Sequence, residues 1–131
     1  MDKFRLLILL VIVSVMAVSC DEEIFGPRSL EGTWKVSENS DAYGPQNFIV
    51  GIEYVSGDSS KIIIDNFSNL DMGVGVSANV SGLMITIPAQ SVNARGGPFR
   101  VSGNGTANAT MRRISWNYRI DDDNFTAIFE K

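Results

Sequence analysis

The chain has 131 residues, a formal net charge of −4, no histidine and a single cysteine. Its 11 basic residues are outnumbered by 15 acidic ones and are scattered, so the chain lacks the basic surface that binding to nucleic acid requires. The lack of histidine removes the commonest general base and a frequent metal ligand, and we expect no catalysis, no metal and no cofactor. This length suits one domain with one hydrophobic core.

The N-terminal segment has the features of an export signal. Lys3 and Arg5 precede an apolar stretch from Leu6 to Val18, and small residues end that stretch. Because about 20 apolar residues are needed to cross a bilayer, this shorter stretch predicts a cleavable signal peptide over residues 1–19 rather than a membrane-spanning helix.

The cysteine follows that segment directly, in the run Ala17-Val18-Ser19-Cys20. This run resembles a bacterial lipoprotein signal, although Ala17 stands where that family most often has leucine. The resemblance implies that fatty acyl chains such as palmitate modify Cys20 and anchor the protein to the outer membrane. The acidic cluster Asp21-Glu22-Glu23 either begins a solvated linker over residues 20–29 or, by its resemblance to Bacteroidetes lipoproteins, directs the protein to the cell surface. We therefore expect a lipid-anchored domain that faces the periplasm or the cell surface.

We take residues 30–131 as one domain. Strand patterns fill the first half of this domain. Val, Ile, Thr and aromatic residues alternate with polar ones between short turns, as is typical of half-buried strands. We predict strands over residues 32–38, 48–54, 61–67 and 75–80. In the third of these strands the run Ile62-Ile63-Ile64 is apolar throughout, so the pattern does not decide which residues point inward.

The second half continues the same pattern. Residues 83–87 predict a strand that ends at Pro88 or lies at a sheet edge there, because proline has no backbone donor for the ladder. Residues 99–106 predict another strand, in which glycines permit a bulge or a bend. The clearest alternation is Ile114, Trp116, Tyr118 and Ile120 against polar neighbours, which predicts a strand over 113–120, and a last strand follows over 125–129.

Eight short strands without a crossover long enough for a helix predict an all-β fold. We expect an antiparallel up-and-down eight-stranded barrel, with a two-sheet β-sandwich as the alternative. The opening Leu30-Glu31-Gly32-Thr33-Trp34-Lys35-Val36 resembles the first strand of lipocalin-like barrels, which implies that Trp34 packs across a closed end of the barrel. The chain lacks the late Thr-Asp-Tyr signature of true lipocalins and the arginine that stacks on that tryptophan, so their ligand classes do not carry over.

Aromatic side chains on the predicted inward faces are the candidate ligand-lining residues. Eight strands enclose a space that either holds one small ligand or is filled by side chains, and both remain open here. The candidates come from the first strand and the last two: Trp34, Trp116, Tyr118, Phe125 and Phe129.

Carboxylates are the other candidates for chemistry. Glu53 and Asp65 on neighbouring predicted strands would have to face each other to act as a glycosidase pair, whereas exposed strand carboxylates are the simpler interpretation. The run Asp121-Asp122-Asp123-Asn124 offers oxygen ligands for calcium, but it has neither the spacers nor the glycine of a calcium loop, and a hairpin turn explains it.

These observations predict a lipid-anchored, non-catalytic binding module. One version places a small apolar or amphipathic ligand inside the barrel, and another places an envelope protein or glycan at the loops Tyr43-Gly44-Pro45 and Arg95 to Phe99. A hydrolase inhibitor or a structural subunit of a surface complex is the further alternative.

Overall fold

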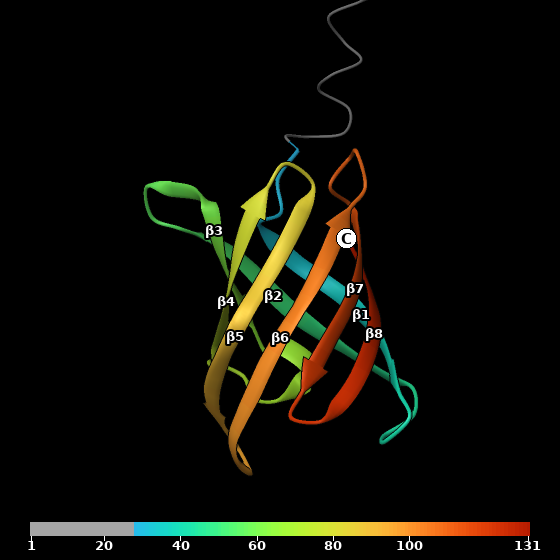
Figure 1. Ribbon diagram of the computed structural model, residues 1–131. Helices are drawn as coiled ribbons and strands as arrows, with labels where there is room; N and C mark the ends of the chain where they lie inside the picture. Colours follow the sequence, from blue (N-terminus) through green and yellow to red (C-terminus); the bar gives the residue numbers. More distant parts are fainter. Residues whose placement is uncertain (1–27) are drawn as a thin grey trace, which may run out of the picture.

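The computed structural model describes residues 28–131, so the predicted signal peptide over 1–19 and Cys20 lie outside the described residues. Eight antiparallel strands form one closed barrel in which each strand pairs with the next and β8 pairs with β1 (Figure 1). The predicted up-and-down barrel is confirmed, and the two-sheet sandwich is excluded. The strands are β1 Gly32–Ser40, β2 Gln46–Val55, β3 Asp58–Asp65, β4 Gly75–Ser81, β5 Met84–Ala94, β6 Gly97–Ala107, β7 Arg113–Ile120 and β8 Asp123–Glu130.

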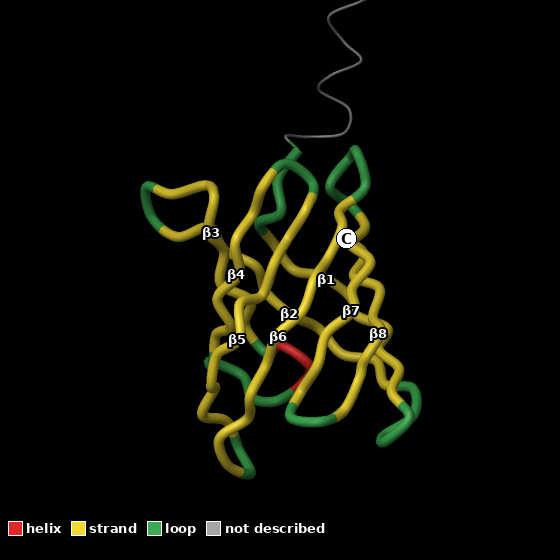
Figure 2. The backbone as a smooth tube through the Cα atoms, viewed as in Figure 1, coloured by secondary structure: helices red, strands yellow, loops and turns green. Residues whose placement is uncertain are grey.

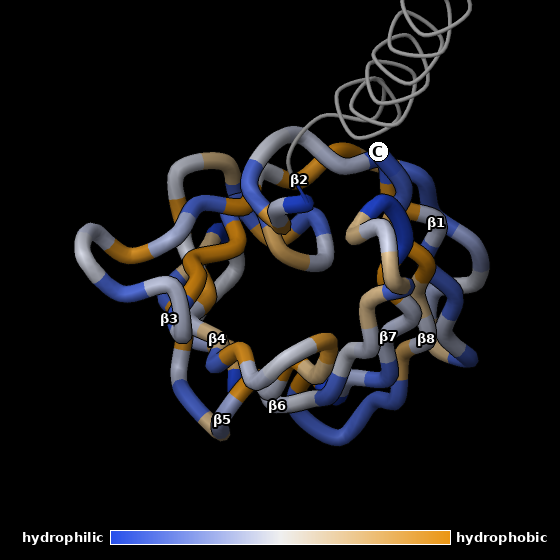
Figure 3. The backbone as a smooth tube through the Cα atoms, turned by 90° about the horizontal axis from the view of Figure 1, so that it is seen from above, coloured by the Kyte–Doolittle hydropathy of each residue, from blue (hydrophilic) through white to orange (hydrophobic). Residues whose placement is uncertain are grey.

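Alternation of apolar and polar residues sets which face of each strand points inward. In β7 the apolar residues predicted on one face are all buried, and their neighbours Arg113, Ser115, Asn117 and Arg119 are all exposed. Viewed along the barrel axis, the backbone of the strands forms a closed ring (Figure 3). None of the buried apolar side chains of the core is more than 6% exposed.

The third predicted strand ends two residues too late. β3 stops at Asp65, and Phe67 lies in a 3-10 turn, η1 Phe67–Asn69, instead of continuing the strand. Asn66 breaks the extended conformation because its φ is 59°, in the left-handed region. Within β3 the buried residues are Ile62 and Ile64, which settles the inward face of the isoleucine run.

The prediction that Pro88 ends the fifth strand or marks a sheet edge is wrong, because β5 continues to Ala94 and pairs with β4 and β6 in the closed barrel. Pro88 lies at a register shift between Ile87 and Gln90, where a bulge needs no ladder donor from the proline. Gln90 compensates on the β4 side: its Oε1 accepts from the Ser77 amide at 3.0 Å and its Nε2 donates to the Ser77 carbonyl at 2.8 Å. The glutamine side chain therefore stands in for a backbone pairing that Pro88 cannot supply.

The β5 and β6 register shifts where Ile87 lies opposite Gly103 and Gln90 lies opposite Val101, so one β6 glycine borders an irregularity of the kind expected. The glycines also have a second role, on the β7 side. The β6 and β7 register runs without a shift from Val101 opposite Ile120 to Ala107 opposite Ile114. A Cβ atom added at Gly105 would lie 2.6 Å from Cε3 of Trp116, far inside van der Waals contact. Glycine is thus required here because the indole ring lies directly across the strand.

The barrel has two ends with different contents, called here the upper and the lower end as drawn in Figure 1. The upper end holds the turns over 55–58, 81–84 and 107–113, together with the first described residues and the C-terminal Lys131. The lower end holds the turns over 40–46, 94–97 and 120–123 and the longer connection that contains η1, drawn in red in Figure 2. No helix among residues 28–131 is long and apolar enough to cross a membrane.

Candidate functional site

All five candidate ligand-lining aromatics point into the barrel, where they pack against one another. Trp34 and Phe129 are 0% exposed, and Trp116, Tyr118 and Phe125 are 2%, 3% and 5% exposed. The Trp116 and Phe129 ring centroids lie 5.3 Å apart, and those of Tyr118 and Phe125 lie 5.5 Å apart. A void large enough for a ligand would leave exposed surface on the side chains around it, so in this structure the aromatics fill the interior.

The upper end is closed by the segment before β1 and by Lys131, which follows β8. Leu30 folds over the interior and is 1% exposed; its amide donates to Tyr54 Oη at 3.1 Å and its carbonyl accepts from Trp34 Nε1 at 2.8 Å. Lys131 Nζ lies 5.0 Å from the Trp34 ring centroid and donates to the Ser29 and Glu31 carbonyls at 2.6 and 2.9 Å. A lysine thus lies over the tryptophan at the place where the resemblance led us to look for an arginine.

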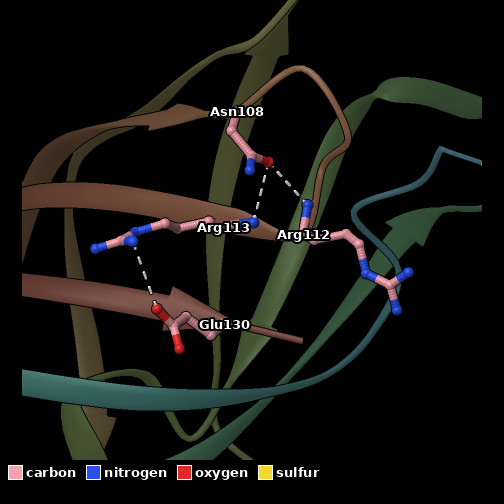
Figure 4. Close-up of polar contacts among 4 residues, drawn as sticks. All are labelled: Asn108, Arg112, Arg113 and Glu130. Atoms are coloured by element: carbon pink, nitrogen blue, oxygen red, sulfur yellow. Dashed lines mark hydrogen bonds and ion pairs between the residues drawn. The ribbon is translucent and has the colours of Figure 1, made fainter.

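Burial lowers the pKa of the Lys131 ammonium, and the nearby Arg112 lowers this pKa further. The same arginine belongs to the turn between β6 and β7, shown in Figure 4. Asn108 Oδ1 accepts from the backbone amides of Arg112 and Arg113 at 3.0 and 3.1 Å, and Arg113 forms a 3.7 Å ion pair with Glu130. The ion pair is solvent-exposed and contributes little, so hydrogen bonds between side chains and the backbone hold this end together.

The lower end contains a buried carboxyl group. Glu38, on β1, is 3% exposed and its side chain lies inside the barrel. Its Oε1 accepts two hydrogen bonds, one from Ser68 Oγ at 2.5 Å and one from the hydroxyl of Tyr118 on β7. Burial raises the pKa of Tyr118 well above its ordinary value, and the neighbouring Glu38 raises it further. Tyr118 therefore stays protonated and acts as a hydrogen-bond donor within the barrel.

A short segment, residues 66–70, covers this carboxyl and is called the plug. Phe67 is 1% exposed and its ring centroid lies 4.5 Å from that of Tyr118. Asn66, Ser68 and Asn69 have φ values of 59°, 53° and 57°, in the left-handed region, which asparagine tolerates better than serine does. This conformation costs a residue such as serine about 1 to 2 kcal/mol and asparagine less, and strain of this kind gathers at functional sites.

One buried donor near this site has no partner. Trp116 Nε1 is fully covered and makes no hydrogen bond to any atom of the described residues. Trp116 and Glu38 both pair with Ala127, one from each side, so they lie in the same cross-strand row of the barrel. Unpaired buried donors are rare in folded proteins, and they commonly mark a place where a water or a ligand binds.

Neither Glu38 nor Ser68 was among the predicted site residues. The alternation that places Trp34 and Val36 inside the barrel also places Glu38 there, so the signal for the carboxyl was present in β1. Ser68 had no such signal because it lies in a loop whose path depends on tertiary contacts.

The other candidate carboxylates lie outside the barrel. Glu53 pairs with Ile63 and Asp65 pairs with Gly51, so the two carboxylates do not face each other across the strands. The run Asp121 to Asn124 turns the chain between β7 and β8, and Asp121 Oδ1 accepts from the Arg100 amide at 3.0 Å. Among residues 28–131 no group of three or more acidic or cysteine side chains has the arrangement of a metal site.

Both loops proposed for partner binding lie at the lower end, beside the plug. Tyr43 is 65% exposed, and its ring centroid lies 6.2 Å from that of Phe125 at the edge of the interior. Phe99 is half-buried and packs against the core, so it offers less surface than expected.

Comparison with known proteins supports the fold. No family model and no curated protein matches the chain. Among solved structures, the chain is similar to a redesigned β-barrel, mFAP1, bound to DFHBI, with a TM-score of 0.59 and 15% identity over 80% of this chain and 100% of that one. A second redesigned β-barrel, b11L5F_LGL, matches with a TM-score of 0.51 and 11% identity over 78% of this chain and 90% of that one. At these identities the similarity shows a β-barrel fold and nothing more.

Proposed function

We propose that this protein is a non-catalytic binding protein, tethered to the outer membrane by lipid on Cys20, that holds a small amphipathic ligand at the lower end of its barrel. The tether is inferred from the signal-like segment before Cys20. The observation that carries the ligand site is a buried carboxyl, Glu38, paired with two hydroxyls beneath a strained plug.

The plug indicates what the ligand looks like. Phe67 supplies an aromatic ring against Tyr118, and Ser68 supplies a hydroxyl donor to Glu38. A small molecule with an aromatic ring and an N–H or O–H donor offers the same two contacts and would replace the plug. The left-handed residues of the plug favour this exchange, because their strain is released when the segment leaves.

The position of the chain ends fits a tethered receptor. The first described residues and Lys131 lie together at the upper end, and the plug lies at the opposite end (Figure 1). A tether that leaves from the upper end presents the lower end away from the membrane. The redesigned barrel mFAP1, described as bound to DFHBI, supports a small ligand as the partner of a barrel of this kind.

Fluorescence of N-phenyl-1-naphthylamine, an aromatic amine, tests the ligand site. We expect the protein to enhance the emission of this probe. We expect Phe67→Ala to tighten binding by about tenfold, or about 1.4 kcal/mol, because the shortened plug competes less well with the probe for the same site. Leu30→Ala is the matched control, because it removes an equally buried side chain at the upper end. Equal tightening in both variants, or no enhancement in either, contradicts the proposed site.

The lipid anchor is tested separately. We expect Cys20→Ala to release the protein from the membrane fraction or to leave its signal uncleaved. Unchanged membrane retention with normal processing would show that the tether is not a lipid on this cysteine.

A further inference from the structure

The outer wall of the barrel carries a groove that the proposed ligand site does not use. Its volume is about 670 Å³, and it crosses β5, β6, β7, β8 and β1. Its lining contains two rows of outward residues with one row of inward residues between them. The longer outward row is made of Thr86, Asn104, Asn117, Thr126 and Asn39.

The strand register makes that row continuous. Thr86 pairs with Asn104, Asn104 with Asn117, Asn117 with Thr126, and Thr126 with Asn39. Neighbouring strands lie about 4.8 Å apart, so four steps carry the row over about 19 Å. The shorter row has Ser102 opposite Arg119 and Arg119 opposite Asn124.

The groove lies on the outside of the barrel. Every residue of the longer row is exposed. The inward residues that also border the groove include Ile87, Tyr118 and Phe125, which are at most 5% exposed. Because the strand pleat sets inward residues closer to the barrel axis, their backbone forms the floor between the two outward rows.

The lining has an unusual chemical character. Amide and hydroxyl side chains dominate it, and its charged residues are Asp41 and Arg119. The outer wall of β2 and β3 differs, because there Ile49 is 56% exposed and the charged Glu53 and Lys61 are exposed as well. An asparagine amide donates and accepts at once, so a row of such groups complements a ligand that does the same. With few charges and little outward apolar surface, the groove fits neither an ionic nor an apolar ligand.

From this arrangement we infer that the outer groove is a binding site for a neutral oligosaccharide. A sugar chain repeats hydroxyl groups along its length, as the groove repeats amides and hydroxyls across five strands. Ordered waters bridge the remaining groups in polar contacts of this kind. This site lies on the outer side of the barrel wall, whereas the site beneath the plug lies on the inner side; Tyr118 borders both.

NMR of the full-length protein, in micelles of a detergent without sugar, tests the inference. The probes are maltohexaose, cellohexaose and mannohexaose, with the acidic hexagalacturonate as the charged comparison. We expect at least one neutral hexasaccharide to shift the side-chain amide signals of Asn104 and Asn117 in a saturable way. The double substitution Asn104→Ala and Asn117→Ala should then weaken that binding by about tenfold or more.

The matched control is Asn93→Ala. Asn93 is also exposed on β5 but lies outside the groove, so its loss should leave binding unchanged. Phe67→Ala should leave it unchanged as well, which separates this site from the one beneath the plug. The inference is overturned if no neutral hexasaccharide shifts these signals at millimolar concentration, if hexagalacturonate alone binds, if Asn93→Ala weakens binding equally, or if the signals respond to protein concentration and not to sugar.

Discussion

The upper end of the barrel is closed by the segment before β1 and the residue after β8, held by hydrogen bonds between side chains and the backbone. The lower end is closed by a plug with three left-handed residues over a buried carboxyl. At the upper end Leu30, Trp34 and Lys131 form regular, well-satisfied contacts. At the lower end Glu38 and the plug keep polar groups and backbone strain inside the protein. The comparison indicates that the contacts of the upper end stabilise the fold. The lower end contains buried polar groups and strained backbone, which cost stability and are typical of functional sites.

The largest expected effect comes from Trp34→Ala at the upper end. Loss of a fully buried tryptophan and of its hydrogen bond to Leu30 should lower the free energy of unfolding by about 4 kcal/mol. Phe67→Ala at the lower end should lower it by less, because release of the plug's strain offsets part of the lost burial. Denaturant unfolding of both variants measures the comparison, and an equal or larger loss for Phe67→Ala would remove the proposed difference between the ends.

Glu38→Ala comes next. It leaves the Ser68 and Tyr118 hydroxyls buried without their acceptor, and we expect a loss of about 2 to 3 kcal/mol in the free energy of unfolding. Glu38→Gln keeps an acceptor oxygen and should lose less. Glu53→Ala, an exposed glutamate on β2, should change stability by no more than about 0.5 kcal/mol. A loss for Glu38→Ala as small as that for Glu53→Ala would mean that the buried cluster does not support the lower end.

Alkaline pH should weaken the protein through Tyr118. Its pKa is raised in the folded state, so the stabilising effect of the protonated hydroxyl is complete below the ordinary tyrosine pKa of about 10 and is lost as the pH rises above it. The free energy of unfolding should fall by up to about 1.4 kcal/mol per pH unit in that range. Tyr118→Phe should reduce this slope, as measured by denaturant unfolding at several pH values; an unchanged slope would show that other groups govern alkaline unfolding.

The smallest expected effect is a gain. Asn69→Gly places the one residue without a Cβ at a φ of 57° and should stabilise the protein by about 0.5 kcal/mol. Asn93→Gly, in an extended and exposed part of β5, should destabilise it by about 0.5 to 1 kcal/mol. Thermal unfolding of the two variants should therefore shift in opposite directions, and a shift in the same direction would argue against strain in the plug.

The strands could be predicted from the sequence because alternation is a local property. The pattern of Ile114, Trp116, Tyr118 and Ile120 gave β7 with its correct ends and faces. The end of β5 could not be predicted from Pro88, because a bulge and the side chain of Gln90 satisfy the backbone around this proline. Neither feature can be recognised in the local sequence.

The candidate site was only partly predictable. The inward aromatics follow from alternation, but whether they enclose a space depends on how their volumes fit together, which a residue pattern does not encode. The plug depends on contacts between residues far apart in the chain, such as Ser68 with Glu38 and Asn66 with the Ile49 carbonyl. The outer groove also depends on register: Asn104 and Asn117 become neighbours through the pairing of β6 with β7, and Asn39 joins their row only when β8 pairs with β1.

The contact between Lys131 and Ser29 has a consequence for protein engineering. The segment before β1 meets the residue after β8 at this contact, so the eight strands form a closed ring. The break in the chain could therefore be moved to another turn between strands. A circular permutant that joins residue 131 to residue 28 through a short linker and opens the chain in the turn over 94–97 would keep every strand pairing. Its new N-terminus would lie beside the plug, so a tether attached to it would turn the barrel over and point the opposite end at the surroundings.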